Sequence, residues 1–449
     1  MGLQPNRRMR GVVGKERRWI NMKKTICLLL ALLLLGGCTG KAAVENKEEK
    51  PLPHVTVYAE PTADLSEMGG ILNIQEIPII DGYDSFVSVL SAAVIDGRTN
   101  KNLSPISVYL AVAMAAEGAR GDTQAELLAL LGEDSIESLR LNAENMLKAL
   151  SGKGRTGELV LANSIWMGMQ DKDVTFHEAY LKTLADSYGA EAQTVPFGEE
   201  EAVRRIVAWI REKTRDKIKV SDDAMQFDAD TLAVLINTIY LKDSWQTPFE
   251  EGNTVQGTFY GLDGQQLNVN YMCREDGDAE IVRGDGYLRY SLALGEVGQM
   301  VFVLPDEAVT LESLLGNRDK IDELLHGGDA KRADVNVMVP KFTFQDRTDL
   351  EEILMDLGVW TCFTGGADFS GMTNTPAHIS RILQESRIGV DEKGVEAAAY
   401  TMIALAKGGV SFEPREQVDF HLTRPFLYAI ESRDGTVLFI GTVAVPDRA

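Results

Sequence analysis

Val390-Asp-Glu-Lys-Gly-Val-Glu-Ala-Ala-Ala-Tyr-Thr-Met-Ile-Ala-Leu-Ala-Lys-Gly-Gly409 is the stretch around which the chain is organised. From Val395 onward, alternate side chains are uncharged and mostly small or aliphatic, a period-2 pattern that predicts a strand with one buried face. The same stretch is rich in alanine, poor in β-branched residues and ends in a Gly-Gly pair, so a helix or an exposed loop also suits it. A segment that fits both an exposed loop and a buried strand is a candidate conformational switch.

Two motifs connect this stretch to a known family. Asp391-Glu-Lys-Gly-Val-Glu-Ala-Ala-Ala399 resembles the hinge of the serpins, serine protease inhibitors whose reactive-centre loop inserts into their own β-sheet. Leu235-Ile-Asn-Thr-Ile-Tyr-Leu-Lys-x-x-Trp-x-x-Pro-Phe249 is also similar to this family, and the resemblance runs from about Asp81 to Pro446. It implies an α+β serpin fold with three β-sheets, about eight or nine helices and an exposed reactive-centre loop.

The resemblance implies a hinge and a reactive bond. Gly394 allows the turn at which the moving strand begins, because glycine has the widest backbone freedom. Counting the loop as in inhibitory serpins, with Glu392 first, ends at Gly408 and implies an elastase-like or subtilisin-like target. A loop one residue shorter ends at Lys407 and implies a trypsin-like target. The candidate hinge residues are Glu392, Gly394, Val395, Glu396, Ala397, Ala398, Ala399 and Thr401, and the candidate reactive bond lies among Lys407, Gly408 and Gly409.

Further residues match the positions at which serpin sheets part. Glu392 could pair with Lys341 and hold the expelled loop. Trp245 would pack where the loop first enters the sheet, although a lone tryptophan is equally compatible with ordinary core. Gln384 stands where the family usually has a histidine, and an amide loses the pH response of imidazole. The complete set implied by the resemblance is Ser104, Ser107, Asn237, Trp245, Lys341 and Gln384.

Local patterns predict caps and turns along the chain. Ser104 is expected to cap the helix that Pro105 opens, an interpretation compatible with its place in the serpin motif. Thr123 is expected to begin the next helix, with Glu126 at capping-box spacing. Between Gly257 and Pro305 the pattern predicts strands and hairpins, with turns at Asp263-Gly264 and Asp276-Gly277.

Motifs of enzymatic chemistry are missing from the sequence. Gly152-Lys-Gly-Arg-Thr-Gly157 matches G-x-G-x-x-G but follows a predicted helix and precedes a predicted strand, the reverse of a dinucleotide-binding loop. The five histidines are scattered without metal-ligand spacing. Outside the N-terminal segment only Cys273 and Cys362 remain, and whether they pair is left open. The sequence therefore predicts neither an enzyme nor a metal or cofactor site.

The net charge of the chain limits the kinds of molecule that it is expected to bind. The 449 residues carry a formal net charge of -22, which argues against nucleic-acid backbones and anionic membrane surfaces as partners. With 45% hydrophobic residues the chain can bury a large core. No second linker or internal repeat follows Ile74, so a single large domain is expected over 73–449.

The N-terminal segment resembles an export signal. Met22-Lys-Lys opens a basic start and an apolar run of signal-peptide length, and Met22 is the expected start of translation. The run ends in Leu35-Gly-Gly-Cys38, which resembles a bacterial lipobox with Cys38 as the lipidated residue; an ordinary signal cut elsewhere is the alternative. We expect residues 1–38 to direct export and residues 39–72 to form a flexible tether. The protein would then be exported and lipid-anchored to the cell membrane, facing outside.

The resemblance implies a function without catalysis by this chain. The expected activity is inhibition of a serine or cysteine protease as a suicide substrate, by cleavage of the loop and its insertion into the central sheet. The expected partner is a trypsin-, elastase- or subtilisin-like protease, and the chain is expected to be a monomer that meets the membrane only through its lipid anchor. The alternative is a non-inhibitory surface protein of serpin fold that binds a partner or is only a protease substrate.

Overall fold

The computed structural model describes residues 57–59, 81–150, 152–154, 156–169, 174–220, 225–316, 318–379, 382–396 and 415–449. These residues form two β-sheets and nine α-helices. The architecture is α+β, as expected from the resemblance. None of the helices among these residues is long and apolar enough to cross a membrane.

The first sheet contains the strand that precedes the hinge. Its strand order is β1-β5-β4-β6-β14-β13-β12, with β3 paired to β4. The central pair, β4 and β6, is antiparallel, with Leu159 opposite Leu241 and Met167 opposite Ala233, and it confirms the strand predicted to follow Gly157. The strands are β1 (Val57–Ala59), β3 (Gly152–Lys153), β4 (Glu158–Gly168), β5 (Ala190–Val195), β6 (Ala233–Ser244), β12 (Phe342–Asp349), β13 (Leu383–Asp391) and β14 (Gly394–Val395).

The second sheet has the strand order β15-β11-β8-β9-β10-β16-β17-β2, with β7 paired to β8. Strand β8 is 19 residues long, and it pairs with β7 near its start and with β9 near its end. Strand β8 therefore joins two of the three expected sheets into one continuous sheet. The strands are β2 (Lys101–Leu103), β7 (Val255–Tyr260), β8 (Gln266–Gly284), β9 (Tyr287–Ala293), β10 (Gly298–Pro305), β11 (Ala330–Pro340), β15 (Glu416–His421), β16 (Phe426–Ser432) and β17 (Val437–Val443).

Of the two predicted turns between β7 and β11, one is present. The Asp263-Gly264 turn is confirmed, since Leu262–Gly264 forms a 3-10 turn between β7 and β8 and Asp263 has φ 56. The Asp276-Gly277 turn is wrong, because both residues lie inside β8. The pairing of β8 with β11 shifts register between Ala333 and Val335, opposite this dipeptide. An Asp-Gly pair that suggests a hairpin here accompanies a β-bulge instead.

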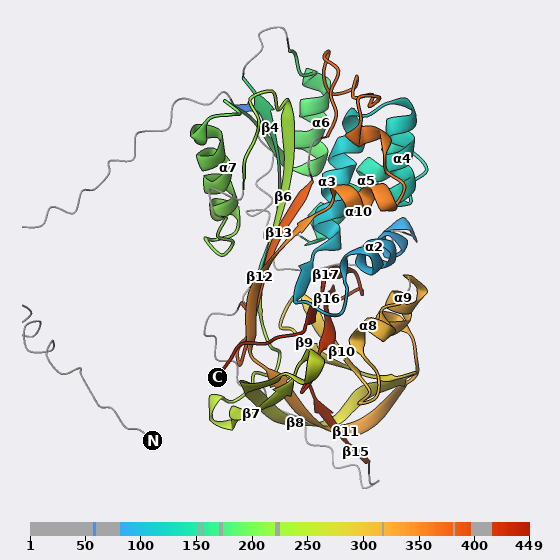
Figure 1. The fold of residues 1–449 in the computed structure, drawn as a ribbon, viewed down its shortest axis with the longest axis vertical. Coiled ribbons are helices and arrows are strands. Elements are labelled where there is room, and N and C mark those ends of the chain that lie inside the picture. Colours follow the sequence, from blue (N-terminus) through green and yellow to red (C-terminus); the bar gives the residue numbers. More distant parts are fainter. Residues whose placement is uncertain are drawn as a thin grey trace, which may run out of the picture. The chain divides into compact units, whose positions relative to one another are not determined.

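Helices cover both faces of the first sheet. Helix α3 is buried at 13 of its 14 positions and contacts β4 and β6 on one face, while α7 contacts β5 and β6 and lies on the opposite face (Figure 1). The arrangement places each face of β6 against a separate apolar cluster. The helices are α2 (Asp81–Val94), α3 (Pro105–Gly118), α4 (Gly121–Leu131), α5 (Ile136–Leu150), α6 (Glu178–Tyr188), α7 (Glu200–Lys213), α8 (Leu311–Leu314), α9 (Arg318–His326) and α10 (Glu351–Asp356).

The two predicted helix caps are wrong in their chemistry. Ser104 occupies the N-cap position of α3, but its hydroxyl makes no capping hydrogen bond. Helix α4 begins at Gly121, and Thr123 Oγ1 accepts a hydrogen bond from Asp368 N at 2.9 Å. Glu126 accepts hydrogen bonds from the backbone N–H groups of Trp360 and Thr361 at 2.8 and 2.7 Å. Donors that are distant in sequence thus occupy the groups that a local capping box would use.

Candidate functional site

The start of the hinge is already a strand of the first sheet. Gly394 and Val395 form β14, in which Val395 pairs with Asp243 of β6 on one side and with Val390 of β13 on the other. Val395 is 2% exposed. The chain therefore enters the sheet between β6 and β13 before it leaves the described part at Glu396.

Gly394 is required by its backbone and by its neighbours. Its φ is 155, and a Cβ built there would lie 2.1 Å from the carbonyl oxygen of Asp243. A side chain at this position would have to displace β6 or expel β14, because real Cβ atoms do not approach a backbone oxygen so closely. Glycine thus permits the insertion of β14 at the end of β6.

Trp245 lies against the turn between β13 and β14. Its indole Nε1 donates to the carbonyl oxygen of Asp391 at 2.8 Å, and its backbone N–H donates to the carbonyl oxygen of Lys393 at 2.9 Å. The ring is 2% exposed and packs edge-to-face on Phe249 with centroids 6.2 Å apart. Trp245 therefore contacts the hinge turn directly rather than serving only as core.

The ion pair expected between Glu392 and Lys341 is present. Lys341 Nζ lies 2.9 Å from Glu392 Oε2, and Thr254 Oγ1 donates to Glu392 Oε1 at 2.8 Å. Burial opposes ionisation of Glu392, but the hydrogen bonds from Lys341 and Thr254 outweigh it and hold the pKa of this carboxyl below its usual value. The turn that precedes β14 is thereby tied to Thr254, which precedes β7, and to Lys341, which follows β11.

Glu396 anchors the other end of the described hinge. Its carboxylate lies 3.0 Å from Arg387 Nε and 2.9 Å from Lys217 Nζ, and its backbone N–H donates to Gly389 O at 2.8 Å. Its φ is 50, in the left-handed region that non-glycine residues seldom adopt. Ala397, Ala398, Ala399, Thr401, Lys407, Gly408 and Gly409 lie outside the described residues, as does Cys38.

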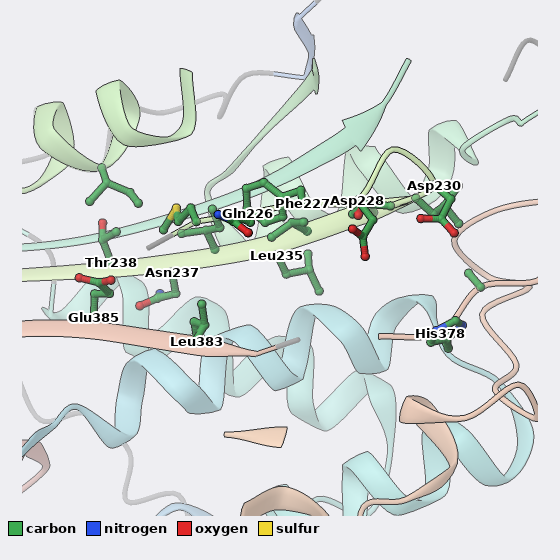
Figure 2. Close-up of a pocket in the computed structure, with 18 of the residues that line it drawn as sticks. Gln226, Phe227, Asp228, Asp230, Leu235, Asn237, Thr238, His378, Leu383 and Glu385 are labelled. Carbon is green, nitrogen blue, oxygen red and sulfur yellow. The ribbon is translucent and has the colours of Figure 1, made fainter. Parts of the chain in front are cut away.

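A cavity of about 430 Å³ lies between the central strands, away from β14. It is lined by residues 232–238 along β6 and by Leu383 and Glu385 of β13, whereas β14 pairs with β6 at Asp243 and Ser244. Residues 225–228, which precede β6, close part of its wall. Figure 2 shows Asn237, Leu383 and Glu385 gathered in this space. Among the described residues, β6 and β13 share no ladder of their own, so an unfilled strand position continues the line of β14.

The family model of the serpins, described as serine protease inhibitors, matches residues 84–446 of this chain. The chain belongs to the serpin family. An uncharacterized serpin-like protein of Thermococcus kodakarensis is 29% identical over 435 residues, covering 95% of this chain and 99% of that protein. Putative serpin-Z12 of Oryza sativa subsp. japonica is 31% identical over 381 residues, covering 79% of this chain and 88% of that protein. The native-state crystal structure of tengpin, a thermophilic serpin, has a TM-score of 0.73 at 27% identity and covers 84% of this chain and 97% of that chain.

In this serpin, Gln384 binds the backbone at the start of α3. Gln384 Oε1 accepts from Ser104 N at 2.9 Å, and Gln384 Nε2 donates to Ser104 O at 2.7 Å. The side chain is 5% exposed, so both halves of the amide are satisfied in a buried position. The amide that replaces the usual serpin histidine therefore fastens β13 to α3 through the main chain.

Ser104, Ser107 and Asn237 complete the set of residues that the resemblance implied. Asn237 Nδ2 donates to Asn163 Oδ1 at 2.6 Å, and Asn163 Nδ2 donates to Tyr188 O at 2.7 Å. Within the described residues, the buried atoms Ser104 Oγ, Ser107 Oγ and Asn237 Oδ1 have no hydrogen-bond partner. Ser104 and Ser107 are thus buried at the start of α3 and Asn237 is buried in β6, and no hydrogen bond among the described residues joins their side chains.

Asp243 is a buried site residue that the sequence analysis missed. Its Oδ2 accepts hydrogen bonds from the backbone N–H groups of Glu296 and Val297 at 2.8 and 2.7 Å, and its Oδ1 accepts from Ser244 N at 2.8 Å. Burial raises the pKa of its carboxyl despite these donors. Asp243 therefore ties the end of β6, next to β14, to the turn between β9 and β10. The available signal was the charged pair Lys242-Asp243 at the end of the mostly apolar strand β6.

The described residues hold no group of three or more histidine, cysteine, aspartate or glutamate side chains arranged to bind a metal ion. Cys273 and Cys362 are both free, which answers the question that the sequence left open. Burial raises the pKa of the Cys362 thiol to about 12, with a further contribution from the Glu126 carboxylate. Cys362 is therefore a neutral core residue.

Proposed function

We propose that this serpin inhibits a serine or cysteine protease as a suicide substrate, with the loop after Glu396 as the segment that the protease cleaves. The observation that supports the proposal most directly is the position of β14 between β6 and β13, with an open strand position beyond it. The target protease supplies the catalysis: its nucleophile attacks a loop carbonyl, the peptide bond breaks and an acyl-enzyme forms. Cleavage frees the N-terminal arm of the loop while it remains bonded to the protease.

The free energy of insertion comes from completing the sheet. An arm of about ten residues that gains ladder hydrogen bonds worth about 1 kcal/mol each would gain about 10 kcal/mol, comparable to the stability of a domain. The bound protease would be carried along with the arm and distorted before water hydrolyses the acyl-enzyme, an ester for a serine protease or a thioester for a cysteine protease. Insertion must therefore be faster than deacylation.

The cleaved loop segment can insert into the sheet only if the side chains that become buried are uncharged. Val395 is buried in the described structure, and Ala397, Ala399 and Thr401 share its face if the strand continues with period 2. A charge on this face would be buried without a partner, at a cost of several kcal/mol. Ala398 and Tyr400 would point to the opposite face of the sheet.

The target class depends on the scissile bond. Cleavage after Lys407 would make a trypsin-like protease the target, and cleavage after Gly408 an elastase-like or subtilisin-like one. We further propose that the protein is exported and anchored through Cys38, which would place the loop at the cell exterior. Both proposals rest on the sequence motifs around these residues.

Incubation with trypsin-, elastase- and subtilisin-like proteases tests the function. The expected result is an SDS-resistant covalent complex with at least one of them, identified by mass spectrometry of the released C-terminal fragment. Ala399→Arg is expected to convert the inhibitor into a substrate, while Ala398→Arg, on the opposite face, retains inhibition. Clean cleavage by every protease, without a complex and without a rise in melting temperature of the cut protein, would favour the non-inhibitory alternative.

A further inference from the structure

The cavity between β6 and β13 has an apolar wall. Leu232, Val234 and Leu235 line it and are only half-buried, although they lie in or next to the central strand of the domain. Ile210 of α7 and Phe227 contribute further apolar surface. A volume of about 430 Å³ is within the range of pockets that bind small organic molecules.

Both ends of the cavity present carboxylates. Figure 2 shows Asp228 and Asp230 at one end, on the side of His378, and Glu385 at the other end beside Asn237. No lysine or arginine is among the described residues that line the cavity. The lining therefore favours a positively charged occupant.

The acceptors at the two ends of the cavity differ in exposure, since those of Asp228 and Asp230 are exposed and that of Asn237 is buried. In the described part of the chain, no hydrogen bond or ion pair involves the carboxylates of Asp228 and Asp230, which are exposed at the mouth. Asn237 is 9% exposed, and its Oδ1 is a buried acceptor without a partner among the described residues. A ligand that satisfies these groups must bring hydrogen-bond donors, and an ammonium group brings three.

Glu385 has partners from β12 outside the cavity. Gln345 Nε2 donates to Glu385 Oε2 at 3.0 Å, and Arg347 Nε lies 3.9 Å from Glu385 Oε1. The Glu385 side chain is 10% exposed, and burial raises the pKa of its carboxyl. A second cation on the cavity side of Glu385 would stabilise the ionised carboxylate in this buried position.

We propose that this cavity binds an elongated diamine, with one ammonium at Asp228 and Asp230, the other at Asn237 and Glu385, and an apolar spacer along β6. The seven residue-to-residue steps from Asp230 to Asn237 span at most about 23 Å when extended. An extended twelve-carbon diamine, about 16 Å from nitrogen to nitrogen, fits within this upper bound. The occupant is thus a diamine whose spacer is longer than that of common short diamines.

A bound diamine would cover the strand edges that the loop needs for insertion. This consequence rests on the proposed inhibitory function, whereas binding itself does not. The diamine would therefore slow insertion without touching the scissile bond. The intact protein would be stabilised, and the cleaved, inserted protein would have lost the site.

Calorimetric titration of the intact protein with 1,6-, 1,8-, 1,10-, 1,12- and 1,14-diaminoalkanes tests the site. We expect affinity to peak near the twelve-carbon compound and to exceed that of decylamine about tenfold, the effect of one charge-assisted contact. Decanoate is expected not to bind. Equal affinity for diamine, monoamine and carboxylate, or no saturable binding, would overturn the proposal.

Variants assign the two ends. Asp228→Asn with Asp230→Asn, and separately Glu385→Gln, should each lower the affinity of the twelve-carbon diamine about tenfold, with Asp263→Asn in an exposed turn as the matched control. Circular dichroism and melting temperature establish that each variant is folded. Asp228 and Asp230 are exposed, so their substitution is not expected to disturb folding. Unchanged affinity of the Asp228→Asn, Asp230→Asn double variant or of the Glu385→Gln variant would refute the two-ended arrangement.

Repeating the titration on loop-cleaved protein separates this inference from the proposed function. Loss of binding on cleavage supports both. Retained binding after cleavage would refute loop insertion but would be consistent with the diamine site. Absence of binding to the intact protein would refute the diamine site alone.

Discussion

Lys341 Nζ and Glu392 Oε2 are 2.9 Å apart at the turn that precedes the hinge strand. Lys341 follows β11, while Glu392 lies in the turn between β13 and β14, so the pair links the two sheets where the loop enters. The Lys341 side chain is 36% exposed and that of Glu392 is 10% exposed, which makes the pair a positional contact of modest energy.

Lys341→Met should lower the free energy of unfolding by about 1 kcal/mol, because Glu392 loses its ion-pair partner while keeping the hydrogen bond from Thr254. The amide of Val395 should also exchange faster in hydrogen-exchange mass spectrometry. Lys393→Met is the control, since Lys393 pairs at 3.7 Å with the exposed Glu251. An effect of equal size in both variants would contradict a specific role of Lys341.

Glu392→Gln should reveal a pH dependence. The folded-state pKa of Glu392 is below its usual value, so the ionised carboxylate stabilises the fold above the unfolded-state pKa of about 4.3. This contribution is lost as the pH falls through the folded-state pKa. Urea denaturation of both proteins from pH 7 to pH 3 should show a stability difference that shrinks below about pH 4. A difference that grows on acidification would refute the assignment.

Gly394→Ala should expel β14 from the sheet. The added Cβ would meet the Asp243 carbonyl oxygen at 2.1 Å, and we expect a loss of about 2 kcal/mol of stability with faster proteolysis near Glu396. Gly252→Ala adds a Cβ with no neighbour within 4 Å and should change stability by less than about 0.5 kcal/mol. Thermal melting and limited proteolysis of the two variants decide the point.

Asp243→Asn should destabilise the junction of the two sheets. An amide has one acceptor oxygen in place of two, and its NH2 group would face backbone N–H donors of Glu296 and Val297 or of Ser244. The expected loss is about 1–3 kcal/mol in urea denaturation. Asp263→Asn, at an exposed turn, should be nearly neutral, and comparable losses in both variants would count against this account.

Gln384→His should weaken the contact between β13 and α3. Imidazole cannot both accept from Ser104 N and donate to Ser104 O in the geometry of an amide, so one buried bond is lost, at about 1–2 kcal/mol near pH 7. The loss should grow below about pH 6, because a protonated ring cannot accept from Ser104 N. Exposed Gln417→His is the control, and a pH-independent effect of Gln384→His would contradict the prediction.

Local patterns predicted the elements that carry strong periodicity. The strands predicted between Gly257 and Pro305 and the turn at Asp263-Gly264 are present, because each depends on nearby residues. The capping functions of Ser104 and Glu126 were wrong, since the donors at Trp360 and Thr361 are more than 200 residues from Glu126 in sequence. A side chain binds the best partner in space, which local spacing does not reveal.

The amino-acid pattern alone determined that this chain is a serpin and predicted the buried strand that starts at Gly394 and Val395, because family motifs and strand periodicity are local properties. Only the tertiary structure decided that β14 is already paired between β6 and β13, that Asp243 is a buried anchor, and that Glu396 meets Lys217 and Arg387. Those relationships depend on which distant strands become neighbours, and the contact energies that select them arise only once the sheet has formed.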